Sequence, residues 1–199
     1  MPICEGCGTR ADNMHIQRRA DRLDLAQRYR PPSIRVLFLD AAPPGRDEDY
    51  FYRSAKDRAI RSLASRMHFD QLIKTVGLAP GSDIVEDKAL ADFQKRGFYL
   101  GYCVECPFEE VDDSSTAVRR FAPTLIKRLQ HDLQPSYVVP ISKPVEELVR
   151  LVGLIGWGDR LVLDNGGPFV DPYFGDPQRQ ASFGTAFGDR ISKLLAALP

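Results

Sequence analysis

Apolar positions along the chain follow two patterns, one continuous over short stretches and one with helical spacing. Four segments are short, apolar and rich in β-branched or aromatic residues, which is typical of buried strands. They span residues 34–39, 98–104, 137–141 and 160–163. Apolar residues at helical spacing predict helices over about 13–29, 54–76, 88–95, 115–133, 142–153 and 185–198. Strands and helices therefore alternate along most of the chain.

This alternation is typical of an α/β protein in which helical crossovers connect parallel strands. We therefore predict a three-layer α/β/α fold with a four-stranded parallel sheet. The 199 residues are enough for one substantial hydrophobic core. We expect a single domain over residues 1–199, with a metal-binding N-terminal segment at 1–10.

In a sheet of this kind, ligands bind beyond the carboxyl ends of the strands. Three segments begin at that edge and are expected to form a crevice: residues 40–52, 106–110 and 164–183. The last segment is long and rich in Gly, Pro and Asp, and such loops in compact domains are usually functional. Its aromatic residues are expected either to close over a planar ligand or to pack back on the core.

The composition limits the kinds of partner. The chain has 27 basic and 27 acidic residues and no formal net charge. It is therefore not expected to coat nucleic acid by charge alone, although a local basic face is compatible with this balance. The first residues lack the apolar stretch of a signal peptide, and no apolar run reaches membrane-spanning length. We expect a cytoplasmic protein that does not interact with membranes.

The cysteines are the most specific chemical feature of the sequence. All four lie in two Cys-x-x-Cys pairs, Cys4/Cys7 and Cys103/Cys106. Each pair can direct two thiolates at one metal, and two pairs supply a four-sulfur shell. The sequence thus predicts one shared site for zinc or, alternatively, for a [4Fe–4S] cluster. The other interpretation is that the thiols are buried or redox-active without a metal.

In the order and spacing of several segments, the chain resembles the uracil-DNA glycosylase superfamily, most nearly its iron–sulfur bacterial and archaeal branch. A Cys-x-x-Cys opens the chain, and an apolar strand runs into a Pro- and Gly-containing turn at 40–45. A Cys-Pro pair follows the second strand at 106–107, and two Asp-Pro pairs at 171–172 and 176–177 precede the last helix. The resemblance covers most of the chain. It implies a fold of this superfamily, a hydrolase activity and a role in DNA repair.

The resemblance points to two carboxylates as catalytic candidates. Ala41 stands where the family has the acidic residue of its first motif, and Asp40 is the adjacent carboxylate. Asp171 stands where the family has the histidine of its second motif. The alternative is that both aspartates only begin turns.

The resemblance also suggests where a base would bind. Phe51 and Tyr52 stand where the family places its stacking aromatic residue, and Gly101 is near the position of the asparagine that reads uracil. Tyr173 is a further substrate-binding candidate from the last loop. Phe51 and Tyr52 are alternatively core residues. The histidines of the chain fall in predicted helices, and His68 is expected at a helix surface.

We therefore expect a divergent uracil-DNA-glycosylase-like protein that acts on or binds a base in DNA or in a nucleotide. The alternative is a non-catalytic domain with a structural metal that binds nucleic acid or a protein partner. Excision of uracil itself is expected to be weak or absent. The reason is that Ala41, Asp171 and Gly101 replace the family's acid, histidine and asparagine.

Overall fold

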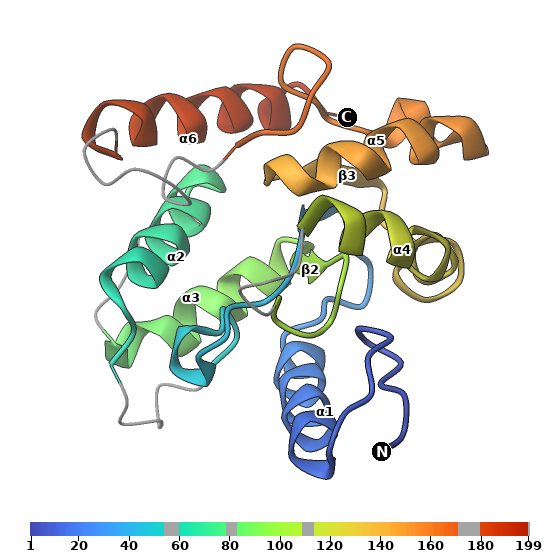
Figure 1. The fold of residues 1–199 in the computed structure, drawn as a ribbon. Helices are drawn as coiled ribbons and strands as arrows, with labels where there is room; N and C mark the ends of the chain where they lie inside the picture. The colour runs from blue at the N-terminus through green and yellow to red at the C-terminus, as the bar shows by residue number, and fades with distance from the viewer. Residues whose placement is uncertain (54–59, 79–82, 109–113, 171–179, 199) are drawn as a thin grey trace.

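The computed structural model describes residues 1–53, 60–78, 83–108, 114–170 and 180–198 (Figure 1). Its strands are β1 (Val36–Asp40), β2 (Phe98–Tyr102) and β3 (Tyr137–Pro140). The α-helices are α1 (Asn13–Arg28), α2 (Leu63–Thr75), α3 (Asp83–Lys95), α4 (Ser114–Lys127), α5 (Glu146–Val152) and α6 (Gln180–Ala196). Short 3-10 helices are η1 (Asp47–Asp49), η3 (Lys143–Val145) and η5 (Gly158–Arg160), and η2 (Arg128–Leu133) and η4 (Gly153–Trp157) are π-helices.

The strands form one parallel sheet in the order β2-β1-β3. Side chains alternate between the two faces of a strand, and parallel partners in register point to the same face. Asp40 pairs with Tyr102, and Leu39 pairs with Gly101. Asp40 and Tyr102 therefore belong to one face of the sheet, and Gly101 belongs to the other. Every residue of β1 and β2 is buried, as expected for a sheet covered on both sides.

The prediction of a four-stranded sheet is wrong, because the sheet formed by the described residues has three strands. Of the predicted strand at 160–163, Leu161 makes a single parallel bridge to Val138, and the N–H of Val162 donates to the carbonyl of Val138 at 2.9 Å. Pro140 is the next residue of β3 whose backbone faces this outer edge, and proline has no N–H to donate to a further strand. The chain then turns away through Asp164–Gly167, where the N–H of Asp164 donates to the carbonyl of Gly167 at 2.8 Å.

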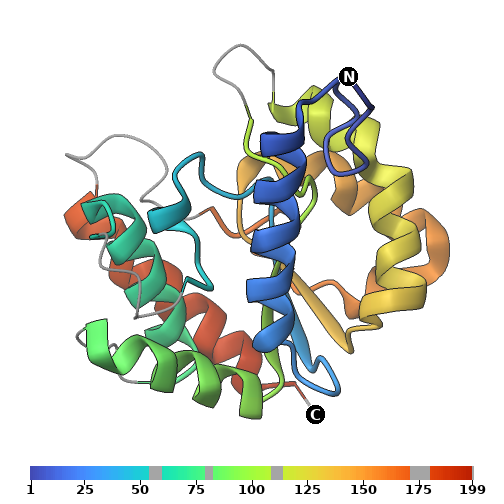
Figure 2. The ribbon, with the colours of Figure 1, turned by 90° about the horizontal axis from the view of Figure 1, so that it is seen from below.

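Helices cover both faces of the sheet. On the Asp40 face, Phe93 of α3 packs against Phe38 of β1, with ring centroids 6.0 Å apart. On the Gly101 face, α1 lies across the strands, with α4 and η2 to one side of it (Figure 2). Helix α6 packs on α2, where the hydroxyl of Ser192 donates to the carbonyl of Thr75 at 2.6 Å. Helix α5 packs on α4.

The helix boundaries differ from the predicted ones mainly at the N-termini. Helix α2 begins at Leu63 because the hydroxyl of Ser62 caps it, accepting from the N–H of Ser65 at 3.2 Å. The predicted start at 54 lies outside the described residues. Pro123 is accommodated inside α4, which continues into the wider turns of η2 as far as Leu133. None of the described helices is long and apolar enough to cross a membrane.

Candidate functional site

Three cysteines and one histidine converge beside the N-terminus of α1. The ligand atoms of Cys4, Cys7, His15 and Cys106 all lie within 4.8 Å of one another. The sulfurs of Cys4 and Cys106 are 3.6 Å apart, and Nε2 of His15 is 3.4 Å from the sulfur of Cys7. Thiolates and a neutral imidazole are good ligands for transition metals. This Cys/His group could therefore hold one metal ion.

Local structure explains why these residues meet. The segment after Cys4 folds back tightly, with the N–H of Gly8 donating to the carbonyl of Cys4 at 2.7 Å. Gly8 has a φ of +67°, a conformation that glycine adopts readily. Asp12 then caps α1 by accepting from the N–H of His15 at 2.8 Å. The cap places His15 in the first helical turn, next to the cysteine turn.

Electrostatics distinguishes the buried thiols of this group. Burial raises the pKa of Cys4, but the N–H of Gly6 and the neighbouring thiols outweigh it, and the net pKa is lowered. Burial raises the pKa of Cys106, and the charges of Cys7 and Cys4 raise it further. Closely spaced thiols resist joint deprotonation unless a cation compensates the charge.

Cys103, the other predicted ligand, lies apart from this group. It is 1% exposed and belongs to the main core. Its N–H donates to the carbonyl of Asp40 at 2.8 Å, so it continues the hydrogen-bond ladder of β2. Burial raises the pKa of the Cys103 thiol, and the charge of Asp40 adds to the effect. His15 is the fourth member of the Cys/His group, whereas the sequence predicted Cys103 as the fourth metal ligand.

Sequence reasoning overlooked His15, although two signals point to it. It follows Cys7 by eight residues, and mixed cysteine and histidine shells are common in zinc proteins. It also stands three residues after Asp12, a good helix cap, which predicts its place in the first turn.

Glu105 connects the Cys/His group to α1 and η2. Its carboxylate accepts from Nε and Nη2 of Arg19 in α1, at 2.8 and 2.5 Å. It also pairs with Nη1 of Arg128 in η2 at 3.1 Å. Its N–H donates to the carbonyl of Gly6 at 3.1 Å. The second cysteine loop is thereby held against the first, against α1 and against η2.

A second feature is a cavity at the carboxyl ends of β1 and β2, which we call the strand-end cavity. Its volume is about 150 Å³. Asp40 and Tyr102 line it from the strands, Phe51 lines it from the following loop, and His68 lines it from α2. The predicted site residues Asp40 and Phe51 are thus brought together. His68 is 8% exposed and lies edge-on to Phe51, with ring centroids 6.5 Å apart, so it is buried and not at a helix surface.

The carboxylate of Asp40 is anchored locally. Its Oδ1 accepts from the N–H of Ala41 at 2.6 Å, and the same N–H reaches the hydroxyl of Ser142 at 3.2 Å. Asp40 is 6% exposed, so it is a buried acid at the end of a parallel strand. This is the location at which the topology predicts ligand contacts.

A buried ionic network supports the wall of the strand-end cavity. Arg61 pairs with Glu86 of α3 at 3.2 Å and donates to the carbonyls of Tyr50 and Phe51 at 2.8 and 3.0 Å. Burial lowers the pKa of Arg61, and the charge of Glu86 opposes that change. These bonds hold the backbone around Phe51 against α3 and restrict its movement.

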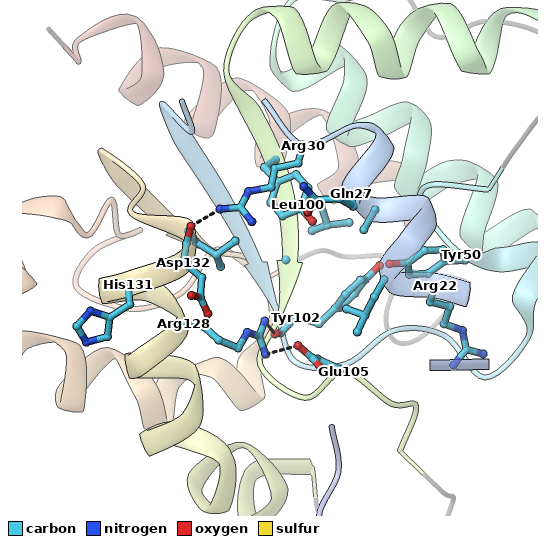
Figure 3. A pocket seen from close by; sticks show the side chains of 15 residues that line it. Arg22, Gln27, Arg30, Tyr50, Leu100, Tyr102, Glu105, Arg128, His131 and Asp132 are labelled. Carbon is cyan, nitrogen blue, oxygen red and sulfur yellow. Dashed lines mark hydrogen bonds and ion pairs between the residues drawn. The ribbon is translucent and has the colours of Figure 1, made fainter. Parts of the chain in front are cut away.

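Two other predicted substrate-binding residues lie elsewhere. The hydroxyl of Tyr52 donates to the carbonyl of Leu100 at 3.0 Å and accepts from its N–H at 2.6 Å. Tyr52 is therefore a fully buried residue that satisfies the outer edge of β2. Gly101 lines a separate opening of about 590 Å³ between α1 and η2, which we call the face cleft (Figure 3).

Part of the last loop lies outside the described residues. Asp171 and Tyr173 lie outside the described residues, as do 109–110 and 171–179. Of the described part, Phe169 is buried, and its N–H donates to the carbonyl of Pro140 at 2.8 Å. The segment 106–108 lines a pocket with the start of α1 rather than the strand-end cavity.

No protein-family model, curated protein or solved structure matches this chain. The interpretation of its sites therefore depends on their own chemistry.

Proposed function

We propose that the strand-end cavity binds a base of DNA or of a nucleotide, and that the protein is a divergent uracil-DNA-glycosylase-like hydrolase. The observation that supports this most is the convergence of a carboxylate, an imidazole and an aromatic ring, from Asp40, His68 and Phe51, on one cavity. Its volume of about 150 Å³ is below the ~300–1,000 Å³ of drug-sized ligand sites. A single heterocyclic ring suits such a space better than an entire nucleotide does.

The chemistry assigned to these residues is hydrolysis of an N-glycosidic bond. The bond between C1′ and the base nitrogen breaks, the sugar acquires oxocarbenium character, and a water oxygen bonds to C1′. Asp40 would stabilise the developing positive charge. His68 would hydrogen-bond the base as it leaves, and one proton of the water ends on the departing base. Phe51 would contact the base through its ring.

Release of free base from single- and double-stranded oligonucleotides that carry uracil or another deaminated base tests this function. We expect slow release that Asp40→Asn lowers by ~100-fold or more, the scale of losing a positioned charged group. Asp24→Asn is the matched control, because Asp24 is an exposed carboxylate of α1 paired with Arg28. If no oligonucleotide loses a base and no free base raises the melting temperature, the proposed function is wrong.

For the Cys/His group, we propose that the ligands hold a structural zinc ion. A tetrahedron with Zn–S bonds of ~2.3 Å and a Zn–N bond of ~2.0 Å has edges of roughly 3.5–3.8 Å. The separations of 3.6 Å between the sulfurs of Cys4 and Cys106 and 3.4 Å between the sulfur of Cys7 and Nε2 of His15 are slightly shorter than those edges and close to them. An iron–sulfur cluster places irons and sulfides between its ligands and needs a wider shell. Four protein donors leave no open coordination position, which is typical of structural zinc.

The alternative function is a non-catalytic domain in which the metal only stabilises the fold. The closed donor set favours it, because this metal would have no position for a substrate. The two functions differ in one measurement. Zinc-loaded protein that binds oligonucleotides without releasing any base supports the non-catalytic domain.

A further inference from the structure

The face cleft lies on the opposite side of the sheet from the strand-end cavity. Its floor is β2, one wall is α1 and the other wall is η2 (Figure 3). Leu23 and Ala26 line it from α1, and Leu133 lines it from η2. Its volume of about 590 Å³ is within the ~300–1,000 Å³ typical of small-molecule sites.

Arginines bridge the face cleft at two places. Arg30, which follows α1, donates to the backbone carbonyl of Asp132 in η2. Arg128 of η2 pairs with Glu105 at 3.1 Å and donates to the carbonyl of Tyr102 at 3.0 Å. Figure 3 shows the two guanidinium groups well separated along β2, with the cleft floor between them. A guanidinium has more N–H donors than these bonds use, and it suits phosphate geometry.

Two tyrosines of the face cleft have hydroxyls with no hydrogen-bond partner among the described residues. Tyr50 is 3% exposed and Tyr99 is 8% exposed, and both line the cleft. Among the described residues, neither hydroxyl has a hydrogen bond, whereas those of Tyr29 and Tyr52 do. The rings are buried, but the two hydroxyl oxygens are not among the buried unsatisfied atoms, so they can bond a ligand in the cleft. Burial raises the pKa of Tyr99, and the charges of Arg30 and Arg128 oppose that change.

Gly101 leaves room above the sheet between these groups. A Cβ at this position would lie 3.0 Å from Cδ1 of Leu37, on the face that carries the cleft. The cleft therefore combines an open, partly apolar floor with unpartnered hydroxyls and flanking guanidinium groups.

We propose that the face cleft binds a phosphorylated small molecule of mononucleotide size. The guanidinium at one end of the cleft floor, that of Arg30 or that of Arg128, would bind the phosphate. The phenols of Tyr50 and Tyr99 would hydrogen-bond hydroxyl groups of the ligand. Three arginines line the cleft against two acidic residues, Glu105 and Asp132, which favours an anionic ligand. This site is independent of the proposed activity at the strand-end cavity, and either can fail without the other.

Calorimetric titration of the full chain with adenosine 5′-monophosphate, ribose 5-phosphate, adenosine and inorganic phosphate tests the proposal. We expect both sugar phosphates to bind, and adenosine to bind at least tenfold more weakly than the monophosphate. The double variant Tyr50→Phe/Tyr99→Phe removes only two oxygens, and it should weaken binding of the monophosphate by roughly tenfold.

Tyr29→Phe is the matched control. It removes a hydroxyl that donates to Asp87 at 3.1 Å outside the cleft, so affinity should not change. The proposal is overturned if neither sugar phosphate binds with a Kd below about 1 mM. It is also overturned if the double variant binds as tightly as the unmodified chain. Equal affinity for inorganic phosphate and the monophosphate would overturn it too, because the cleft would then recognise only charge.

Discussion

The two Cys-x-x-Cys segments have the same spacing, but their sulfurs face different surroundings. In the first segment, both Cys4 and Cys7 belong to the Cys/His group. In the second, Cys106 belongs to the group, whereas Cys103 is packed in the main core. The difference shows that spacing determines how far apart two thiols are along the chain, but not which way each one points.

The backbone explains the difference. The first segment is a turn outside the sheet, closed by the bond between Gly8 and Cys4 and by the bond from the N–H of Cys4 to the carbonyl of Thr9, so no strand directs its side chains. Cys103 instead continues β2, since its N–H bonds the carbonyl of Asp40. The alternation of a strand then sends its side chain into the core. Cys106 follows after the strand has ended and can turn toward the N-terminus.

The largest expected effect on metal binding and stability comes from removing Cys106 from the Cys/His group. Cys106→Ser should abolish stoichiometric metal binding and lower the melting temperature steeply, because structural zinc contributes on the order of 10 kcal/mol in small zinc domains. Elemental analysis and thermal unfolding measure both results. Cys103→Ser is the paired control and should retain one metal ion per chain. Equal loss of metal in the two variants would show that Cys103 is a ligand after all.

The next effect concerns the histidine that takes the fourth place. His15→Ala should weaken metal affinity by more than ~100-fold, beyond the ~10–100-fold typical of changes outside the ligand shell. Competition with a colorimetric zinc chelator measures the affinity. His15→Cys should restore binding, because a thiolate can replace the imidazole. An unchanged affinity of His15→Ala would exclude this residue from the shell.

A smaller effect is expected at Cys103 itself. Cys103→Ser introduces a hydroxyl into an apolar core and should cost about 1–3 kcal/mol of unfolding free energy. Cys103→Ala removes one buried heavy atom and should cost about 1 kcal/mol, the scale of an Ile→Val change. Urea unfolding of metal-loaded protein compares the two. A stabilised Cys103→Ser variant would contradict the placement of this thiol in the core.

The smallest effect distinguishes the glutamates of the two segments. Glu105→Gln weakens the pairs with Arg19 and Arg128, in which the carboxylate is 14% exposed, and should cost about 1–2 kcal/mol. Glu5→Gln changes an exposed residue of the first segment and should be within about 0.5 kcal/mol of the unmodified chain. The same urea experiment measures both. Equal costs would mean that Glu105 does not hold the loops together.

Local patterns in the sequence determined most of the secondary structure. The apolar runs around Val36, Phe98 and Tyr137 are strands, and the helical periods after Asp12 and around Leu125 are helices. These elements depend on residues close along the chain. The same holds for the turn at Cys4, which uses the positive φ of Gly8.

Tertiary structure decided what these elements do together. Pro140 and the turn at Asp164 prevent a fourth strand, although the run at 160–163 is apolar enough for one. His68 lies in a cavity because α2 packs over the end of β1, and no periodicity in α2 shows that. Cys103 lies in the core because it continues a strand, and His15 lies in the Cys/His group because it follows a helix cap. The direction of a side chain depends on hydrogen bonds to distant backbone, and local spacing does not contain that information.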